Sequence, residues 1–197
     1  MTTFVKICGM TSEAALAAAA AAGADAVGFV FAPSPRQVTP QDARELAHSL
    51  PHSMIRVAVM HHPPTELLHE VLAVFKPDWL QTDVEDLNSI VLPASCEALP
   101  VYRNGSVSGQ TQFGQRIVFE GSISGSGQTA DWTEAKALAT HTRLILAGGL
   151  GVDNVAQAIG EVHPWGVDVS SGVERERGHK DPDKIQAFIA EVRALEN

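Results

Sequence analysis

The sequence predicts an α/β fold, a parallel (β/α)8 barrel that forms a single domain over residues 1–197. Eight short apolar or β-branched segments recur along the chain, spaced so that a crossover helix fits between most neighbours. Six helical patterns lie between these segments or after the last one. Periodicity alone does not show whether the sheet closes, so a doubly wound open sheet is the alternative.

Each predicted strand is a short run typical of a buried strand. The eight runs are Phe4–Cys8, Asp25–Phe31, Met54–Met60, Asp78–Thr82, Leu99–Arg103, Arg116–Glu120, Arg143–Ala147 and Trp165–Ser170.

The predicted helices begin at or near prolines in three cases, where a missing backbone N–H costs nothing. Residues 104–114 read NGSVSGQTQFG and are rich in Gly, Ser and Gln, which favours a loop. The sequence therefore predicts a TIM barrel whose fifth helix is short or missing. The helices expected are Glu13–Ala22, Pro40–Ser49, Pro64–Phe75, Trp132–Ala139, Val152–Ile159 and Pro182–Leu195.

Composition excludes several classes of protein. The net charge of −9 argues against a nucleic-acid partner. No apolar run is long enough to span a bilayer, and acidic residues flank the alanine-rich run, so we expect a cytoplasmic protein. Two cysteines are too few for a disulfide framework, and the eight histidines form no convincing metal set. His61 and His62 are interpreted as exposed loop residues, and neither metal nor cofactor is expected.

The last two strand ends predict a phosphate site. Gly148 and Gly149 follow the seventh predicted strand and precede a helix, and Ser170, Ser171 and Gly172 lie at the end of the eighth. Small residues expose backbone N–H groups, and a helix N-terminus adds partial positive charge. Because barrels of this kind often hold phosphate between these two loops, we expect a small phosphorylated substrate here.

Cys8 is a candidate base. It ends the first strand, where a barrel carries its reactive groups, and Gly9 follows it. A thiol serves as a general base when its surroundings favour the thiolate. Lys6 points to the same face as Cys8, because side chains alternate along a strand. We expect Lys6 to lie inside the barrel and to pair with Asp168 of the last strand.

Five segments resemble the phosphoribosylanthranilate isomerases of tryptophan biosynthesis. They read VKICGMT, GADAVGFVFAPSPRQVTP, GSGQTADW, AGGLGVDNV and VDVSSGVERERGHKD, and they run through nearly the whole chain. The resemblance implies a (β/α)8 barrel and an Amadori rearrangement of N-(5'-phosphoribosyl)anthranilate without metal or cofactor. It also implies that Cys8 removes the C2' proton, that Arg36 holds the anthranilate carboxylate and that the two small-residue loops hold the phosphate.

The chain departs from this family at three positions. The family carries an aspartate as general acid at the end of the sixth strand, where this chain has Glu120, so Glu120 is the expected acid. Asp83 follows the fourth strand in place of the family's histidine and is the fallback acid. Gln128 stands where a basic residue is common.

Two alternatives stay open. A histidine-pathway sugar-phosphate isomerase performs the same rearrangement, but its base is an aspartate and its chain is longer. A barrel that binds a phosphorylated ligand without converting it would explain the departures. The sequence leaves the oligomeric state open between monomer and homodimer.

Overall fold

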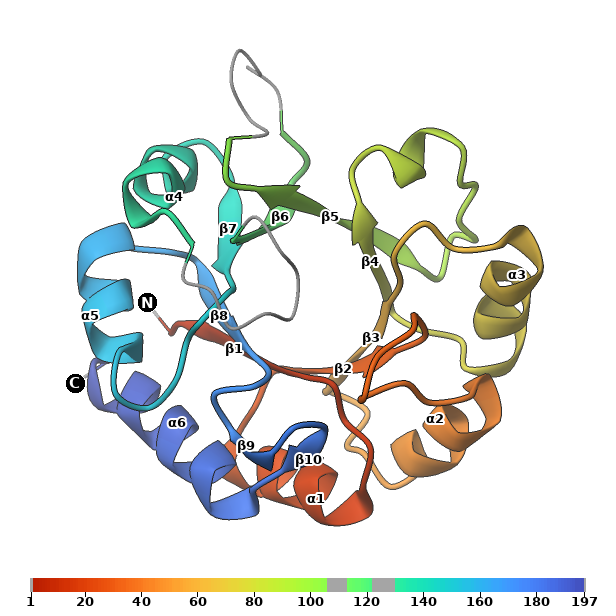
Figure 1. Cartoon of the computed structure of the whole chain (residues 1–197), viewed down its shortest axis with the longest axis horizontal. Helices are drawn as coiled ribbons and strands as arrows, with labels where there is room; N and C mark the ends of the chain where they lie inside the picture. The colour runs from red at the N-terminus through yellow and green to blue at the C-terminus, as the bar shows by residue number, and fades with distance from the viewer. Residues whose placement is uncertain (1, 106–112, 122–129, 197) are drawn as a thin grey trace.

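Eight parallel strands close into a barrel in the order β1 to β8, and pairing of β1 with β8 completes the ring (Figure 1). The structure is a computed structural model that describes residues 2–105, 113–121 and 130–196. Closure confirms the predicted barrel and sets aside the open sheet. The strands are β1 (Phe4–Cys8), β2 (Ala26–Val30), β3 (Ile55–Val59), β4 (Trp79–Asp83), β5 (Glu97–Arg103), β6 (Arg116–Glu120), β7 (Arg143–Leu146) and β8 (Gly166–Val169).

Helices surround the barrel (Figure 1). Within the described residues the α-helices are α1 (Glu13–Ala22), α2 (Pro40–Ala47), α3 (Thr65–Val74), α4 (Trp132–Ala139), α5 (Val155–Val162) and α6 (Pro182–Ala194). The connection from β4 to β5 carries a short 3-10 helix, η1 (Asp86–Asn88). The expectation of a short or missing fifth helix falls mainly on residues 106–112, which lie outside the described residues.

Side-chain caps fix where several helices begin. Thr39 and Asp42 form a reciprocal capping box at the start of α2. The carboxylates of Asp131 and Asp181 accept backbone N–H groups at the starts of α4 and α6. None of the described helices is long and apolar enough to cross a membrane.

The position of α5 corrects the sequence prediction. The apolar pattern predicted a helix over Val152–Ile159, but α5 covers Val155–Val162. The Asn154 side chain accepts the Gly151 N–H at 2.8 Å and donates to the Gly149 carbonyl at 2.9 Å. These bonds hold the preceding residues in a turn, so the helix begins after Asn154.

Two apolar clusters divide the core. One lies between the sheet and the helices and includes Val5, Ile7 and Phe29. The second consists mainly of strand residues that alternate with the first set, so it fills the inside of the barrel. Phe4 and Lys6 lie on this inner face, as alternation along β1 requires.

Aromatic rings close the amino-terminal end of the barrel. The Phe4 ring stacks on Trp165 with centroids 4.5 Å apart and on Trp79 at 5.5 Å. The Arg116 guanidinium lies 4.5 Å from the centre of the Trp79 ring. We call Phe4, Trp79 and Trp165 the barrel floor.

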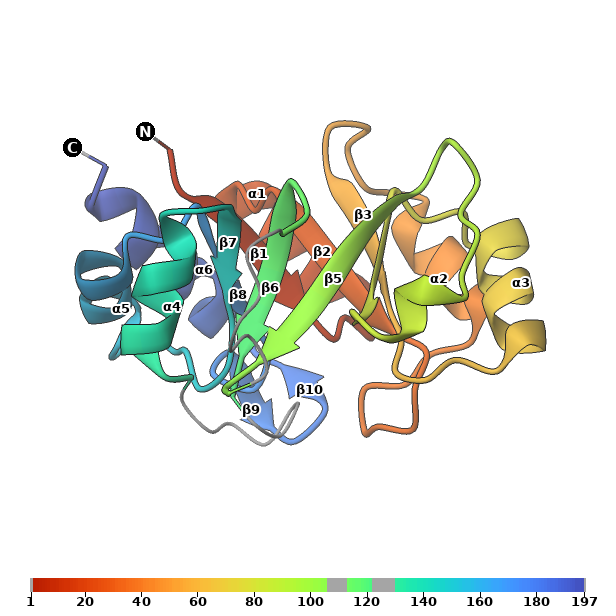
Figure 2. The same ribbon diagram turned by 90° about the horizontal axis from the view of Figure 1, so that it is seen from above.

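An antiparallel pair of strands, β9 (Glu174–Glu176) and β10 (His179–Lys180), lies in the connection from β8 to α6. Figure 2 shows this pair at the end of the barrel toward which β5 and β6 point. No pattern in the sequence predicts this pair. These strands are three and two residues long, too short for an alternating pattern to reveal.

Candidate active site

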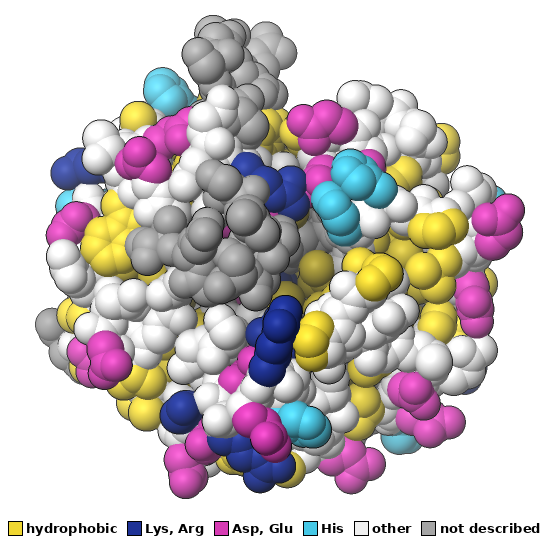
Figure 3. Space-filling model, viewed as in Figure 1, with side chains coloured by type: hydrophobic (Ala, Val, Ile, Leu, Met, Phe, Trp, Pro, Cys, Tyr) yellow, Lys and Arg dark blue, Asp and Glu magenta, His cyan; other side chains and the backbone are white. Residues whose placement is uncertain are grey.

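The carboxyl ends of all eight strands face one mouth of the barrel, because the strands are parallel and the ring is closed. Cys8 ends β1, Asp83 ends β4 and Glu120 ends β6. Figure 3 shows this face, with Lys or Arg side chains near its centre and histidine side chains beside them. The sequence-predicted reactive groups therefore share one end of the molecule.

Cys8 lies beside a buried ion pair. Lys6 is fully buried, and its Nζ atom lies 2.7 Å from Asp168 Oδ2, which confirms the predicted pair inside the barrel. A Cβ atom at Gly28, the neighbour on β2, would lie 3.1 Å from Cys8 Sγ and 3.3 Å from Lys6 Nζ. Glycine at position 28 therefore leaves room for the thiol and the amine to lie close together.

Burial and charge act in opposite directions on these groups. Burial raises the pKa of the Cys8 thiol above its usual value, while Lys6 and Lys180 act to lower it. Burial works to lower the pKa of Lys6, but the Asp168 carboxylate and the Cys8 sulfur outweigh it, so the pKa of Lys6 rises. Lys6 is thus held as a cation next to the thiol.

Ser170 lies against the backbone of Cys8. Its hydroxyl donates to the Cys8 carbonyl at 3.0 Å, and Lys180 Nζ donates to the Ser170 carbonyl at 3.0 Å. Lys180 is buried, and burial lowers its pKa. The structure therefore uses the Ser170 side chain to join β8 to the end of β1.

Arg36 is also buried, with its guanidinium bound to Glu174. The Arg36 Nε atom donates to Glu174 Oε1 at 2.6 Å, and Nη2 donates to Oε2 at 2.9 Å. Lys180 Nζ and the Gly178 N–H also donate to this carboxylate. Burial would raise the pKa of Glu174, but the hydrogen bonds from Arg36 and Lys180 lower it to about 2. These contacts fix the orientation of the Arg36 fork.

The two small-residue loops lie side by side. Gly151 and Gly172 form a parallel bridge, and a Cβ atom at Gly172 would stand 2.0 Å from the Leu150 carbonyl oxygen. Gly148 and Gly149 adopt positive φ angles of 87° and 64°, which favour glycine. This contact places the ends of β7 and β8 at one position on the rim.

A pocket of about 550 Å³ opens between these loops. Its lining includes three predicted phosphate-site residues, Gly149, Ser171 and Gly172, and also Lys184. Gly148 and Ser170 are not part of the lining. Lys184 Nζ donates to the Glu174 carbonyl at 2.8 Å, so the pocket has a cation at its edge.

Arg103 connects the two candidate acids. Its Nη1 atom lies 2.6 Å from Asp83 Oδ1, and Nη2 lies 3.1 Å from Glu120 Oε1. The Asp83 side chain is 6% exposed and that of Glu120 is 12% exposed. Both carboxylates therefore lie in a partly dry region of the mouth.

Three charged residues of the site were not predicted from the sequence: Arg103, Glu174 and Lys180. Arg103 is the last residue of β5, so the rule that selected Cys8 and Glu120 would have found it. Glu174 and Lys180 lie in the β9–β10 segment, which no pattern revealed. Gln128 lies outside the described residues.

A family model described as N-(5'-phosphoribosyl)anthranilate (PRA) isomerase matches residues 5–191. The N-(5'-phosphoribosyl)anthranilate isomerase of Streptococcus pneumoniae strain Hungary19A-6 is 40% identical over 195 residues, which cover 97% of this chain and 96% of the relative.

Solved structures agree. The phosphoribosyl anthranilate isomerase of Thermotoga maritima superposes with a TM-score of 0.85 and 31% identity, over 98% of this chain and all of that one. A phosphoribosyl anthranilate isomerase in complex with reduced 1-(o-carboxyphenylamino)-1-deoxyribulose 5-phosphate superposes with a TM-score of 0.80 and 29% identity. This match covers 98% of this chain and 100% of that one. Sequence and fold thus agree along the whole barrel, and the chain belongs to the N-(5'-phosphoribosyl)anthranilate isomerase family, the isomerases of tryptophan biosynthesis.

Proposed function

We propose that the chain converts N-(5'-phosphoribosyl)anthranilate to 1-(2-carboxyphenylamino)-1-deoxyribulose 5-phosphate, with Cys8 as general base and Glu120 as general acid. The observation that carries this proposal is the position of Cys8, which ends β1 beside the Lys6–Asp168 pair. Membership of the isomerase family sets aside the histidine-pathway alternative.

The reaction needs proton transfers at four positions of the sugar: the ring oxygen, C2', the C2' hydroxyl and C1'. Glu120 gives a proton to the furanose ring oxygen, the C1'–O bond breaks, and the aniline nitrogen lone pair forms the C=N bond of a protonated Schiff base. Cys8 as thiolate then removes the C2' proton, and the C2'–H electron pair forms an enol-amine. Proton transfer from the C2' hydroxyl and to C1' completes the ketone.

Lys6 favours the thiolate form of Cys8, the form that acts as a base. Burial alone would leave Cys8 a thiol, because a thiolate is costly in a dry site. The Lys6 ammonium next to the sulfur stabilises the thiolate, and Asp168 keeps Lys6 charged. Of the Asp168 oxygens, Oδ1 is buried without a hydrogen-bond partner among the described residues, so it can accept a hydrogen bond from the sugar.

Two anchors position the substrate. Glu174 engages two of the five N–H groups of Arg36, and the remaining three can bind the anthranilate carboxylate. The pocket at Gly149, Ser171 and Gly172 offers backbone N–H groups to the phosphate at the other end. Fixing both ends holds the sugar between base and acid, which is the main contribution of positioning to the rate.

The assembly and location of the chain extend the proposal. The family includes an enzyme described as dimeric, that of Thermotoga maritima. We propose that this chain is a monomer or a homodimer and that it lies in the cytoplasm. We also propose that it catalyses the isomerisation without a metal or cofactor.

Loss of anthranilate fluorescence during turnover tests the function. Purified protein should consume the substrate, and the Cys8→Ala variant should bind it but consume it on the order of 10² to 10⁴ times more slowly. If the unmodified protein binds the substrate but leaves the fluorescence unchanged, the protein is instead a barrel that binds a phosphorylated ligand without converting it.

A further inference from the structure

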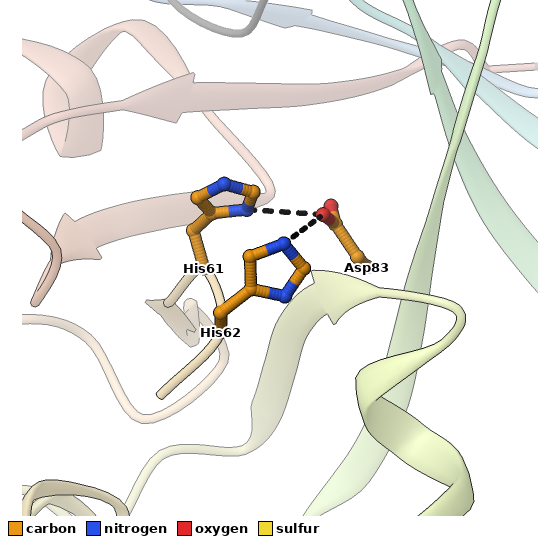
Figure 4. A group of neighbouring side chains, drawn as sticks. All are labelled: His61, His62 and Asp83. Atoms are coloured by element: carbon orange, nitrogen blue, oxygen red, sulfur yellow. Dashed lines mark ion pairs between the residues drawn. The ribbon is translucent and has the colours of Figure 1, made fainter. Parts of the chain in front are cut away.

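Two histidines and an aspartate meet at the barrel mouth, in a cluster to which the proposed reaction gives no role. His61 and His62 follow β3, and Asp83 ends β4, which is hydrogen-bonded to β3. Figure 4 shows both imidazole rings turned toward the Asp83 carboxylate. The histidine side chains are 55% and 64% exposed, as expected for loop residues, whereas the Asp83 side chain is 6% exposed.

The spacing of the three side chains fits a single ion. Asp83 Oδ2 lies 3.0 Å from His61 Nδ1 and 3.8 Å from His62 Nε2, and all three ligand atoms lie within 4.8 Å of one another. Tetrahedral ligands at zinc-like bond lengths are separated by roughly 3.3 Å. The two distances from Asp83 lie on either side of that value, so small side-chain rotations bring all three atoms onto one ion.

The other nitrogen of His62 is already held. His62 Nδ1 lies 2.7 Å from Asp86 Oδ1. The second oxygen of Asp86 accepts from the Thr82 hydroxyl at 2.6 Å and from the backbone N–H of His62 at 3.0 Å. Metal-binding histidines usually donate their second ring N–H to such a carboxylate, which fixes the tautomer and the ring orientation. In the neutral ring that donates from Nδ1 to Asp86, Nε2 carries the lone pair, and it lies 3.8 Å from Asp83 Oδ2.

The Asp83 carboxylate is also held by a neighbouring charged side chain. Arg103 contacts its Oδ1 atom at 2.6 Å, so the Oδ2 atom faces the histidines. The backbone of His62 adopts a φ of 45°, an uncommon conformation for a residue with a Cβ atom. Such residues occur often at functional sites, where the surrounding structure holds them in place.

We propose that His61, His62 and Asp83 bind one first-row transition-metal ion, best matched by Zn²⁺, at the rim of the barrel. Two imidazoles and one carboxylate suit zinc or cobalt, whereas magnesium and calcium prefer oxygen ligands throughout. Three protein ligands leave a fourth position open to water or another small ligand. The proposal does not depend on the isomerase reaction, in which Cys8 and Glu120 take part.

Metal titration of the full chain, freed of any affinity tag and of bound metal, tests the proposal. Co²⁺ should bind with one ion per chain and give the visible absorption of a low-coordinate cobalt site, and Zn²⁺ should displace it. In calorimetry, Asp86→Asn should weaken Zn²⁺ binding about 10- to 100-fold, since it removes the outer carboxylate and leaves the three ligands intact. The His61→Ala, His62→Ala double variant should lose the site.

His141→Ala is the matched control. His141 is an exposed histidine just before β7, at the opposite end of the barrel, so its loss should leave Zn²⁺ affinity unchanged. The exposed positions of His61 and His62 make unfolding of the double variant unexpected, and circular dichroism checks it. Absence of Zn²⁺ uptake at millimolar concentration overturns the proposal. Unchanged one-to-one binding in the double variant also overturns it.

Discussion

The Arg36 guanidinium donates two parallel hydrogen bonds to Glu174, with N–O distances of 2.6 and 2.9 Å. Both side chains are buried at the barrel mouth. The pair therefore sets the direction in which the remaining Arg36 N–H groups point. Because Lys cannot reproduce a planar fork, this geometry gives a direct test of the carboxylate anchor.

Arg36→Lys should raise the KM for N-(5'-phosphoribosyl)anthranilate about tenfold or more, a loss of about 1.4 kcal/mol, with a smaller effect on kcat. Steady-state fluorescence kinetics measure both constants. Arg56→Lys is the control, because Arg56 makes a similar two-point contact with Asp78 near the other end of the barrel. An equal rise in KM for both variants would mean that Arg36 acts only through stability.

Glu174 should make the protein sensitive to acid. Its pKa is lowered to about 2 from an ordinary 4.5, so the folded state favours the charged form. The resulting stability is complete above pH 4.5 and is lost as the pH falls toward 2, and it amounts to roughly 3 kcal/mol. Urea unfolding between pH 7 and pH 3 measures it. Glu174→Gln should show a smaller decline over this range, and an identical decline would remove Glu174 as the cause.

Cys8→Ala should lower kcat by a factor on the order of 10² to 10⁴, as expected for loss of a general base. In the unmodified protein kcat/KM should rise with pH through the ionisation of Cys8, because the thiolate is the base and burial raises the pKa of the thiol. Cys96→Ala is the control, since Cys96 immediately precedes β5 at the far end of the barrel. Full activity in Cys8→Ala would exclude Cys8 as the base.

Removing Lys6 tests the support for Cys8. Lys6→Met leaves Asp168 buried without its partner, so it should destabilise the fold by about 3–5 kcal/mol. In the folded fraction, the rise of kcat/KM with pH should shift to higher pH, because Lys6 acts to lower the pKa of Cys8. An unshifted profile would show that Lys6 has only a structural role.

Glu120→Gln should lower kcat by about 10² to 10⁴ and change substrate affinity little. Asp83→Asn should lower kcat much less, although Arg103 contacts both carboxylates. Single-turnover measurements of anthranilate fluorescence compare the two. The reverse order of effects would transfer the acid role to Asp83.

Strand and helix positions were largely predictable, because they depend on local patterns. The runs Phe4–Cys8 and Arg116–Glu120 form strands with the predicted bounds. The start of α5 was wrong by three residues, because the Asn154 side-chain bonds that delay it are not visible in an apolar pattern. Local periodicity therefore predicted which helices and strands form more accurately than it predicted where they begin and end.

The site was predictable where the fold supplies the position. The positions of Cys8 and Glu120 at the mouth were predictable because strand ends in a barrel lie at one end, while their catalytic roles stay predictions. The Lys6–Asp168 pair followed from the adjacent first and last strands. The partner of Arg36 was not predictable, because Glu174 lies 138 residues away in a hairpin that no sequence pattern indicates. For the same reason His61 and Asp83 were considered separately, and the structure brings them to 3.0 Å.

The barrel floor affects how ligands travel. Among the described residues, the Phe4 ring stacks on Trp79 and on Trp165 at the amino-terminal end, and these rings obstruct the barrel axis there. We therefore expect substrate to enter and product to leave at the mouth formed by the carboxyl ends of the strands. Product that is still bound below this mouth occupies the substrate site, so accumulated product should act as a competitive inhibitor.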